Sequence, residues 1–141
     1  PERTFWDKIM ILHGLRQWHD RRGELRYGGQ RVSRHYYDVH QLMQAPSAAE
    51  WQADYKLAID CAHHARLFFG SPDLGLESAI PGTFMLVPNT TMRNALRKDY
   101  DAMAGMIFGD IPPFDAVLHS AEHFEQIVNE AAMAALTTKG M

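Results

Sequence analysis

Apolar residues recur at helical spacing in five separate stretches of the chain. Because a helix places residues three and four apart on one face, such a repeat predicts an amphipathic helix. The predicted helices cover residues 4–18, 33–45, 47–69, 90–108 and 112–135. Residues 84–87 could be extended, but no second strong strand candidate offers them a partner. The pattern therefore predicts an all-α fold, a compact bundle of about five helices.

Proline and glycine interrupt the helical pattern between residues 70 and 91, which predicts an irregular, ordered connector laid across the helices. The residues responsible are Pro72, Gly75, Pro81, Gly82 and Pro88. Two helix starts carry capping signals. Ser47 with Glu50 forms a capping box, and Thr90 or Thr91 is expected to cap the fourth helix.

Two charged residues fall on otherwise apolar helix faces. Lys8 lies between Leu12 and Leu15 on the first helix, and Asp99 lies near the centre of the apolar face of the fourth. A buried charge is costly unless it is paired. Lys8 must therefore reach a carboxylate at the helix edge or point into a cleft. Asp99 also needs a partner, and Lys8 and Arg34 are the candidates.

Residues 33–42 are dense in polar groups that border an apolar stripe. Arg34 and Asp38 are four residues apart, where an ion pair can form on a helix. A docked structural helix and one wall of a cleft would both show this pattern. The preceding residues 19–30 are predicted to be a loop, whose arginines interleaved with Tyr27 could engage phosphates and a base. A solvated loop would look the same.

Composition narrows the class of protein. The 141 residues suit one domain spanning residues 1–141. A net charge of −3 excludes a general polycation. A lone cysteine, Cys61, excludes an internal disulfide and fits a reducing compartment such as the cytoplasm. Apolar runs are too short to cross a membrane. Because the first residue is Pro1 rather than methionine, we expect a processed chain or a fragment.

One motif suggests a metal. His119, Glu122 and His123 match the H-x-x-E-H spacing of inverted zinc peptidases. Their face is opposite the apolar stripe and little chain follows for a further ligand, so we expect no metal site there. A zinc-binding helical protein is accordingly the weakest hypothesis. The sequence also lacks a glycine-rich phosphate loop and an Asp-x-Asp pair, so no complete two-metal phosphoryl-transfer site can be assembled.

Two N-terminal blocks resemble the AbiEii/AbiGii toxin family of nucleotidyltransferases. They are residues 2–9 (ERTFWDKI) followed by Leu12 and His13, and residues 33–39 (SRHYYDV) followed by Leu42. Later positions resemble the tail of the same proteins: residues 81–83, 87–88, 99–100 and 107–109 with Leu96 and Met103. The family combines an N-terminal nucleotidyltransferase core, bearing Gly-Ser and Asp-x-Asp, with a mostly helical C-terminal part. This chain resembles the second part.

The resemblance implies the chemistry and the site. An RNA hydroxyl would attack the α-phosphate of a nucleoside triphosphate, with Mg²⁺ bound by the N-terminal domain that is absent here. Lys8 and Asp38 match family positions in the active-site region, and Arg31, Arg34 and Tyr37 are expected to bind substrate. Where the family usually has Arg-Asp before the Tyr-Asp pair, this chain has His35 after the arginine.

We therefore expect a C-terminal domain that completes a nucleotide and RNA cleft and is not catalytic alone. Its expected partners are the N-terminal nucleotidyltransferase domain, tRNA and a cognate antitoxin, with no membrane. The alternative is a non-enzymatic helical module that binds a protein or an antitoxin.

Overall fold

The computed structural model describes residues 2–26, 31–68, 71–105 and 111–139. Within these ranges all regular structure is helical, so the prediction of an all-α fold is confirmed. The α-helices are α1 (Glu2–Arg22), α2 (Ser33–Met43), α3 (Ala48–Ala53), α4 (Tyr55–Phe68), α5 (Thr90–Ala104) and α6 (Phe114–Lys139). Two short 3-10 helices, η2 (Pro72–Leu74) and η3 (Leu76–Ser78), lie in the connector.

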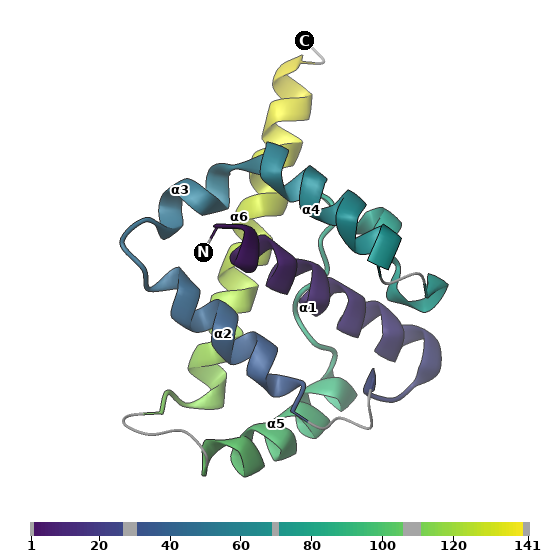
Figure 1. Cartoon of the computed structure of the whole chain (residues 1–141), viewed down its shortest axis with the longest axis vertical. Coiled ribbons are helices and arrows are strands. Elements are labelled where there is room, and N and C mark those ends of the chain that lie inside the picture. Colours follow the sequence, from purple (N-terminus) through teal and green to yellow (C-terminus); the bar gives the residue numbers. More distant parts are fainter. Residues whose placement is uncertain (1, 27–30, 69–70, 106–110, 140–141) are drawn as a thin grey trace.

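Helix α1 crosses the middle of the molecule and the other helices pack around it (Figure 1). It contacts α2 on one side and α4 with η2 on the other, and α6 runs behind it. Trp6 is fully buried and its ring packs against those of Phe5, Phe84 and Phe124. The Trp6 indole N–H donates to the carbonyl of Trp51, at 2.8 Å. This aromatic cluster joins α1, α6 and the connector in one core.

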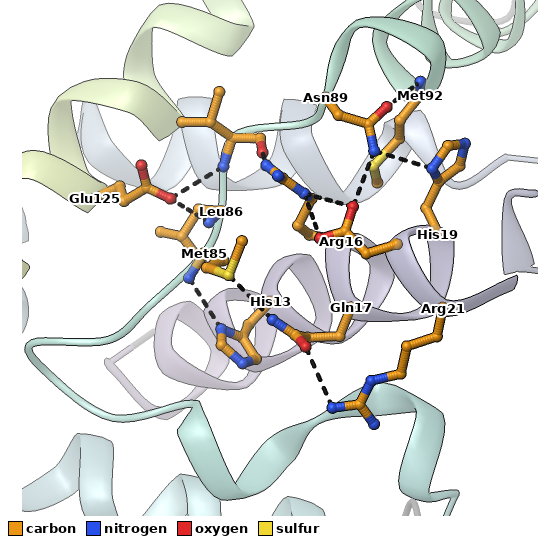
Figure 2. Close-up of polar contacts among 12 residues, drawn as sticks. His13, Arg16, Gln17, His19, Arg21, Met85, Leu86, Asn89, Met92 and Glu125 are labelled. Atoms are coloured by element: carbon orange, nitrogen blue, oxygen red, sulfur yellow. Dashed lines mark hydrogen bonds and ion pairs between the residues drawn. The ribbon is translucent and has the colours of Figure 1, made fainter. Parts of the chain in front are cut away.

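The connector is ordered because helix side chains bind its backbone, as Figure 2 shows in part. The Met85 amide donates to His13 of α1, and the Leu86 amide donates to Glu125 of α6. Asn129 accepts from the amides of residues 82 and 84 and donates to the carbonyl of Phe84. Side chains thus replace the neighbouring strand that an extended segment would otherwise need. The prediction of an ordered connector is confirmed.

Several predicted boundaries were wrong. Helix α1 continues to Arg22, so the first residues of the expected loop 19–30 are helical. The expected third helix is broken at Asp54, whose carboxylate accepts the amide of Leu57. An aspartate that binds a nearby amide competes with continuous helix and starts a new one. The predicted end of the fourth helix, residues 105–109, falls largely outside the described residues.

The predicted capping residues were also wrong. Ser47 does occupy the position before α3, but its side chain makes no capping hydrogen bond. Asn89, rather than Thr90 or Thr91, caps α5 by accepting the Met92 amide at 2.8 Å.

Asp99 binds the start of α2, contrary to the expectation that it pairs with Lys8 or Arg34. Its carboxylate accepts the amides of Arg31 (2.6 Å) and Ser33 (2.8 Å) and the Ser33 hydroxyl (2.5 Å). The residue in the cap position, Val32, has no polar side chain, so the carboxylate comes from α5 instead. A negative charge is favourable at the N-terminal end of a helix. Arg31 adopts the left-handed conformation, with φ of 60°, at this junction.

His13 is fully buried and links α1 to both ends of the connector. Because the Met85 amide donates to Nδ1 at 3.0 Å, the proton of the neutral ring must be on Nε2. Nε2 lies 3.1 Å from the Gly75 carbonyl oxygen and 3.0 Å from the Ser78 hydroxyl. Burial lowers the pKa of His13. The fold therefore depends on an uncharged imidazole at this position.

We expect Asp99→Ala to lower the free energy of unfolding by about 2 kcal/mol, because it removes the cap of α2 and leaves buried donors without an acceptor. Urea denaturation monitored by circular dichroism measures this. Asp101→Ala is the matched control: it removes an exposed carboxylate from the same helix and should change stability by less than about 0.5 kcal/mol. Equal effects of the two substitutions would contradict the capping role.

The free energy of unfolding should fall as the pH drops below about 6.5, the ordinary histidine pKa. The pKa of His13 is lower in the folded than in the unfolded chain, so its contribution is complete above pH 6.5 and is lost on acidification. Denaturation at pH 7.5 and pH 5 measures the slope. His13→Asn should make the slope shallower and lower stability, while His35 and His40, whose pKa values burial also lowers, supply the rest of the slope.

Candidate functional site

Lys8 of α1 meets two side chains of α2. Its ammonium nitrogen lies 3.1 Å from Oδ2 of Asp38 and 3.1 Å from Nδ1 of His35. His35 and Asp38 are three residues apart, so they share the face of α2 that packs on α1. The side chains of Lys8 and Asp38 are 23% and 28% exposed. The charge that looked misplaced on an apolar face is therefore paired, with water still within reach.

The protonation of this cluster follows from its donors. An ammonium group only donates, so Nδ1 of His35 accepts and the ring is neutral with its proton on Nε2. Burial, reinforced by the charge of Lys8, lowers the pKa of His35 to about 4, and Asp38 partly opposes this. At neutral pH the charges are Lys8 (+1), Arg34 (+1) and Asp38 (−1). The cluster therefore carries one net positive charge.

Arg34 lies on the outer edge of the cluster. Its Nε is 4.0 Å from Oδ2 of Asp38 and its side chain is 67% exposed. The predicted Arg34–Asp38 pair is thus present but long, and such exposed pairs contribute little to stability. The guanidinium remains largely accessible to a solute.

The structure brings three of the five predicted site residues together. Lys8, Arg34 and Asp38 belong to the cluster, together with His35. Tyr37 and Arg31 make other contacts. The Tyr37 hydroxyl accepts a hydrogen bond from Gln41 at 2.7 Å. Arg31 contributes its backbone amide to Asp99, and the residue is exposed.

His35 also lines a cleft of about 240 Å³ that the sequence did not reveal. The cleft lies over α1 and is lined mainly by apolar side chains of α1, α2, α4, η2 and η3, including those of Ile11, Leu15, Val32, Leu74 and Leu76. Arg26 and His35 are the charged or titratable residues in its lining. The lining residues come from separate stretches of the sequence, around positions 10–15, 26–35, 65 and 74–76, so no local pattern could have predicted the cleft.

Gly14 determines how closely η2 approaches the floor of the cleft. A Cβ atom at this position would lie 3.3 Å from Cδ2 of Leu74, which is tighter than an ordinary contact. The missing side chain therefore lets the connector pack against α1 at this point.

Two arginines of the predicted loop 19–30 are engaged with carboxylates of the connector. Arg21 pairs with Glu77 at 3.6 Å, and Arg22 pairs with Asp73 at 2.6 Å. Arg22 and Arg26 also place their guanidinium groups over the ring of Trp18, at 4.3 and 5.0 Å from its centroid. Tyr27 lies outside the described residues. These pairs favour a role in joining α1 to the connector.

The zinc-peptidase motif is spread over a helix surface. His119 and His123 are exposed, with ring centroids 6.4 Å apart, and Glu122 pairs with Arg93 at 3.3 Å. Among the described residues, no group of three or more His, Cys, Asp or Glu side chains could hold a metal ion. Searching the same residues also finds no helix long and apolar enough to cross a membrane.

Comparison with known proteins gives one informative finding. The family model described as "Nucleotidyl transferase AbiEii toxin, Type IV TA system" matches residues 1–129. Neither a curated protein nor a solved structure matches this chain.

We expect Lys8→Met to raise the pKa of His35 from its value of about 4, because the substitution removes the ammonium that disfavours the imidazolium. Asp38→Asn should lower the same pKa, because it removes a negative charge. Nuclear magnetic resonance titration of the imidazole measures both shifts. Shifts of the same sign in the two variants would contradict the geometry of the cluster.

Proposed function

Because the chain belongs to the AbiEii nucleotidyl transferase toxin family, whose model covers residues 1–129, we propose that it is the helical C-terminal domain of a nucleotidyltransferase toxin. In this proposal the chain completes an active site that it shares with a separate N-terminal domain, and that domain binds a nucleoside triphosphate. An RNA hydroxyl, such as that at the acceptor end of tRNA, attacks the α-phosphate there. The chain does not catalyse the transfer alone.

The observation that carries the proposal is the held ammonium of Lys8. Of its three N–H donors, two are directed at Asp38 and His35, which fixes the side chain and leaves one donor for a phosphate oxygen. A cation fixed in a partly dry site stabilises charge on a phosphoryl group without reorganising during the reaction. Lys8 therefore binds and orients the triphosphate, and Asp38 orients Lys8.

His35 helps to hold the Lys8 ammonium, and for this purpose a neutral imidazole has one advantage over a second carboxylate. A carboxylate at this position would cancel the net positive charge of the cluster, whereas a neutral imidazole accepts from Lys8 and keeps that charge. The cluster is correspondingly attractive to a triphosphate, and the exposed guanidinium of Arg34 adds a second donor group.

The cluster is not suited to hold Mg²⁺. That ion is usually bound by carboxylates and substrate phosphates in octahedral geometry, and Asp38 is already neutralised by Lys8. In our proposal the metal and the nucleotidyltransferase carboxylates belong to the N-terminal domain. A cognate antitoxin is a further expected partner of a family described by its toxin–antitoxin system. The cytoplasm, where nucleotides and tRNA are found, is the expected location.

A second candidate function is a protein-binding module without a catalytic role. It is favoured by apolar side chains on the outer face of α4: Ile59, Leu67 and Phe68 are 56%, 72% and 71% exposed. Exposed apolar residues of this size can mark a protein interface. Such a module would need neither the fixed Lys8 nor the positive cluster.

We expect Lys8→Met and Asp38→Asn to lower kcat for nucleotide transfer by about 100-fold, in a protein that carries both this chain and the nucleotidyltransferase domain. The matched control is the exposed pair of Arg3 and Asp60, which also joins α1 to another helix, at 2.9 Å. Arg3→Met and Asp60→Asn should leave kcat within about twofold. Transfer of radiolabelled nucleotide to RNA measures the rates, and circular dichroism checks the fold.

Two results would contradict the catalytic role. Unchanged transfer by the Lys8 variant would remove Lys8 from the mechanism and favour the protein-binding module. The second result is a decrease in kcat that merely parallels the loss of stability and is as large in the Arg3 and Asp60 variants as in the Lys8 and Asp38 variants. The cluster would then have a structural role only.

A further inference from the structure

We propose that the cleft over α1 binds a nucleobase, and that the phosphate of the same nucleotide reaches Lys8 and Arg34. This inference rests on the proposed function and assigns a particular place in this chain to the substrate. The ligand chemistry is a planar ring joined through a sugar to a phosphate group. The nucleotide can come from the incoming nucleoside triphosphate or from the end of the RNA.

The geometry of His35 connects the cluster with the cleft. Its Nδ1 faces the ammonium of Lys8, and the same ring lines the cleft. The protonated Nε2 is on the opposite side of the imidazole, and none of the hydrogen bonds found among the described residues uses it. One side chain therefore holds the phosphate-binding cation and offers an N–H donor to a ring in the cleft.

The size and lining of the cleft suit a single nucleobase. Its volume of about 240 Å³ is below the range of about 300–1,000 Å³ that drug-sized ligands occupy. Walls formed by Ile11, Val32 and Leu74 offer dispersion contacts to the faces of a ring. Arg26 and His35 are the polar residues in the lining. In a mostly apolar pocket, a few polar groups of this kind fix the orientation of the ligand. A base with an acceptor atom at its edge would use the His35 N–H.

The charges around the cleft favour an anionic ligand. Lys8, Arg34 and Asp38 sum to one positive charge, and Arg26 adds a guanidinium to the lining itself. The Arg26 guanidinium also lies over the ring of Trp18, 5.0 Å from its centroid. An uncharged apolar ligand would use the walls but not these cations. A nucleotide uses both, because its phosphate and its base are separated by one sugar.

A binding experiment on this chain tests the inference. Isothermal titration calorimetry with EDTA present would measure the affinity of ATP, CTP, GTP, UTP, a single-stranded RNA trinucleotide and inorganic triphosphate. Ile11→Trp fills the cleft from a half-buried position, and Ala65→Leu fills it from α4. Ile127→Trp is the control, because Ile127 is 40% exposed on α6 and is not part of the lining.

We expect a nucleotide to bind about tenfold more tightly than inorganic triphosphate, because the base buries its apolar faces against the aliphatic walls of the cleft. Both filling variants should abolish the difference and keep the affinity for inorganic triphosphate, while the control variant binds like the wild type. Lys8→Met should weaken the binding of nucleotide and triphosphate alike. Preference for a nucleoside triphosphate identifies the incoming nucleotide as the source, and preference for the trinucleotide identifies the RNA.

The inference is overturned if no nucleotide or trinucleotide binds more tightly than inorganic triphosphate. It is also overturned if the filling variants, shown to be folded by urea denaturation, bind nucleotide as the wild type does. Neither result bears on the dependence of transfer on Lys8. Failure of the base site and failure of the proposed function can therefore be distinguished.

Discussion

The binding of the α2 N-terminus by Asp99 is the interaction on which the site depends. Helix α2 supplies His35 and Asp38 to the cluster and one wall to the cleft, so its position sets both. The residue before α2, Val32, has no side chain that could cap the helix. The carboxylate of Asp99, which is far away in the sequence on α5, accepts the amide of Ser33 instead. Asp99 thus sets the positions of His35 and Asp38, although none of its hydrogen bonds within the described ranges is to either residue.

A second constraint is that residues 84–87 of the connector cross the molecule with no strand beside them in the part of the chain that the structure describes. The amides of the connector are satisfied by His13 and Glu125 and by the amide group of Asn129. Each of these polar side chains lies on a helix that also forms the core. Polar residues on apolar helix faces are therefore of two kinds here. Some, such as His13, bind the backbone of the connector, and others, such as Lys8, pair with side chains of a neighbouring helix.

The sequence predicted the helical class because apolar periodicity is a local property that packing reinforced. It also identified Lys8 and Asp99 as unusual, since a charge on an apolar face needs an explanation whatever the fold. The sequence predicted the wrong partner for Asp99. The spacing of apolar residues along one helix does not reveal which other helix packs against it. The prediction failed at Asp54 for a different reason. The residue caps a new helix only because the chain turns there, and a polar residue within a helical pattern is otherwise ordinary.

From the sequence, His35 was noted only as a departure from the usual family sequence and was assigned no role, because its chemistry depends on its neighbours in space. An imidazole can accept from an ammonium, donate into a cavity or become charged, and its neighbours select among these. Lys8 and the buried position select the neutral ring that accepts from the ammonium. The cleft could not be predicted at all, because residues from separate stretches of the sequence form it.

The hydrogen bonds of Asp99 join the start of α2 to α5, and they hold Arg31 in a left-handed backbone conformation. A residue other than glycine holds this conformation at some cost, and here the hydrogen bond of its amide to Asp99 opposes the return to an ordinary conformation. Separation of the two helices would release the strain and expose the α2 amides at the same time. Local opening of the cleft wall is thereby tied to the undocking of α5. A ligand that stabilises α2 would, by thermodynamic linkage, also lower the population of molecules in which α5, a helix that the ligand never contacts, is undocked.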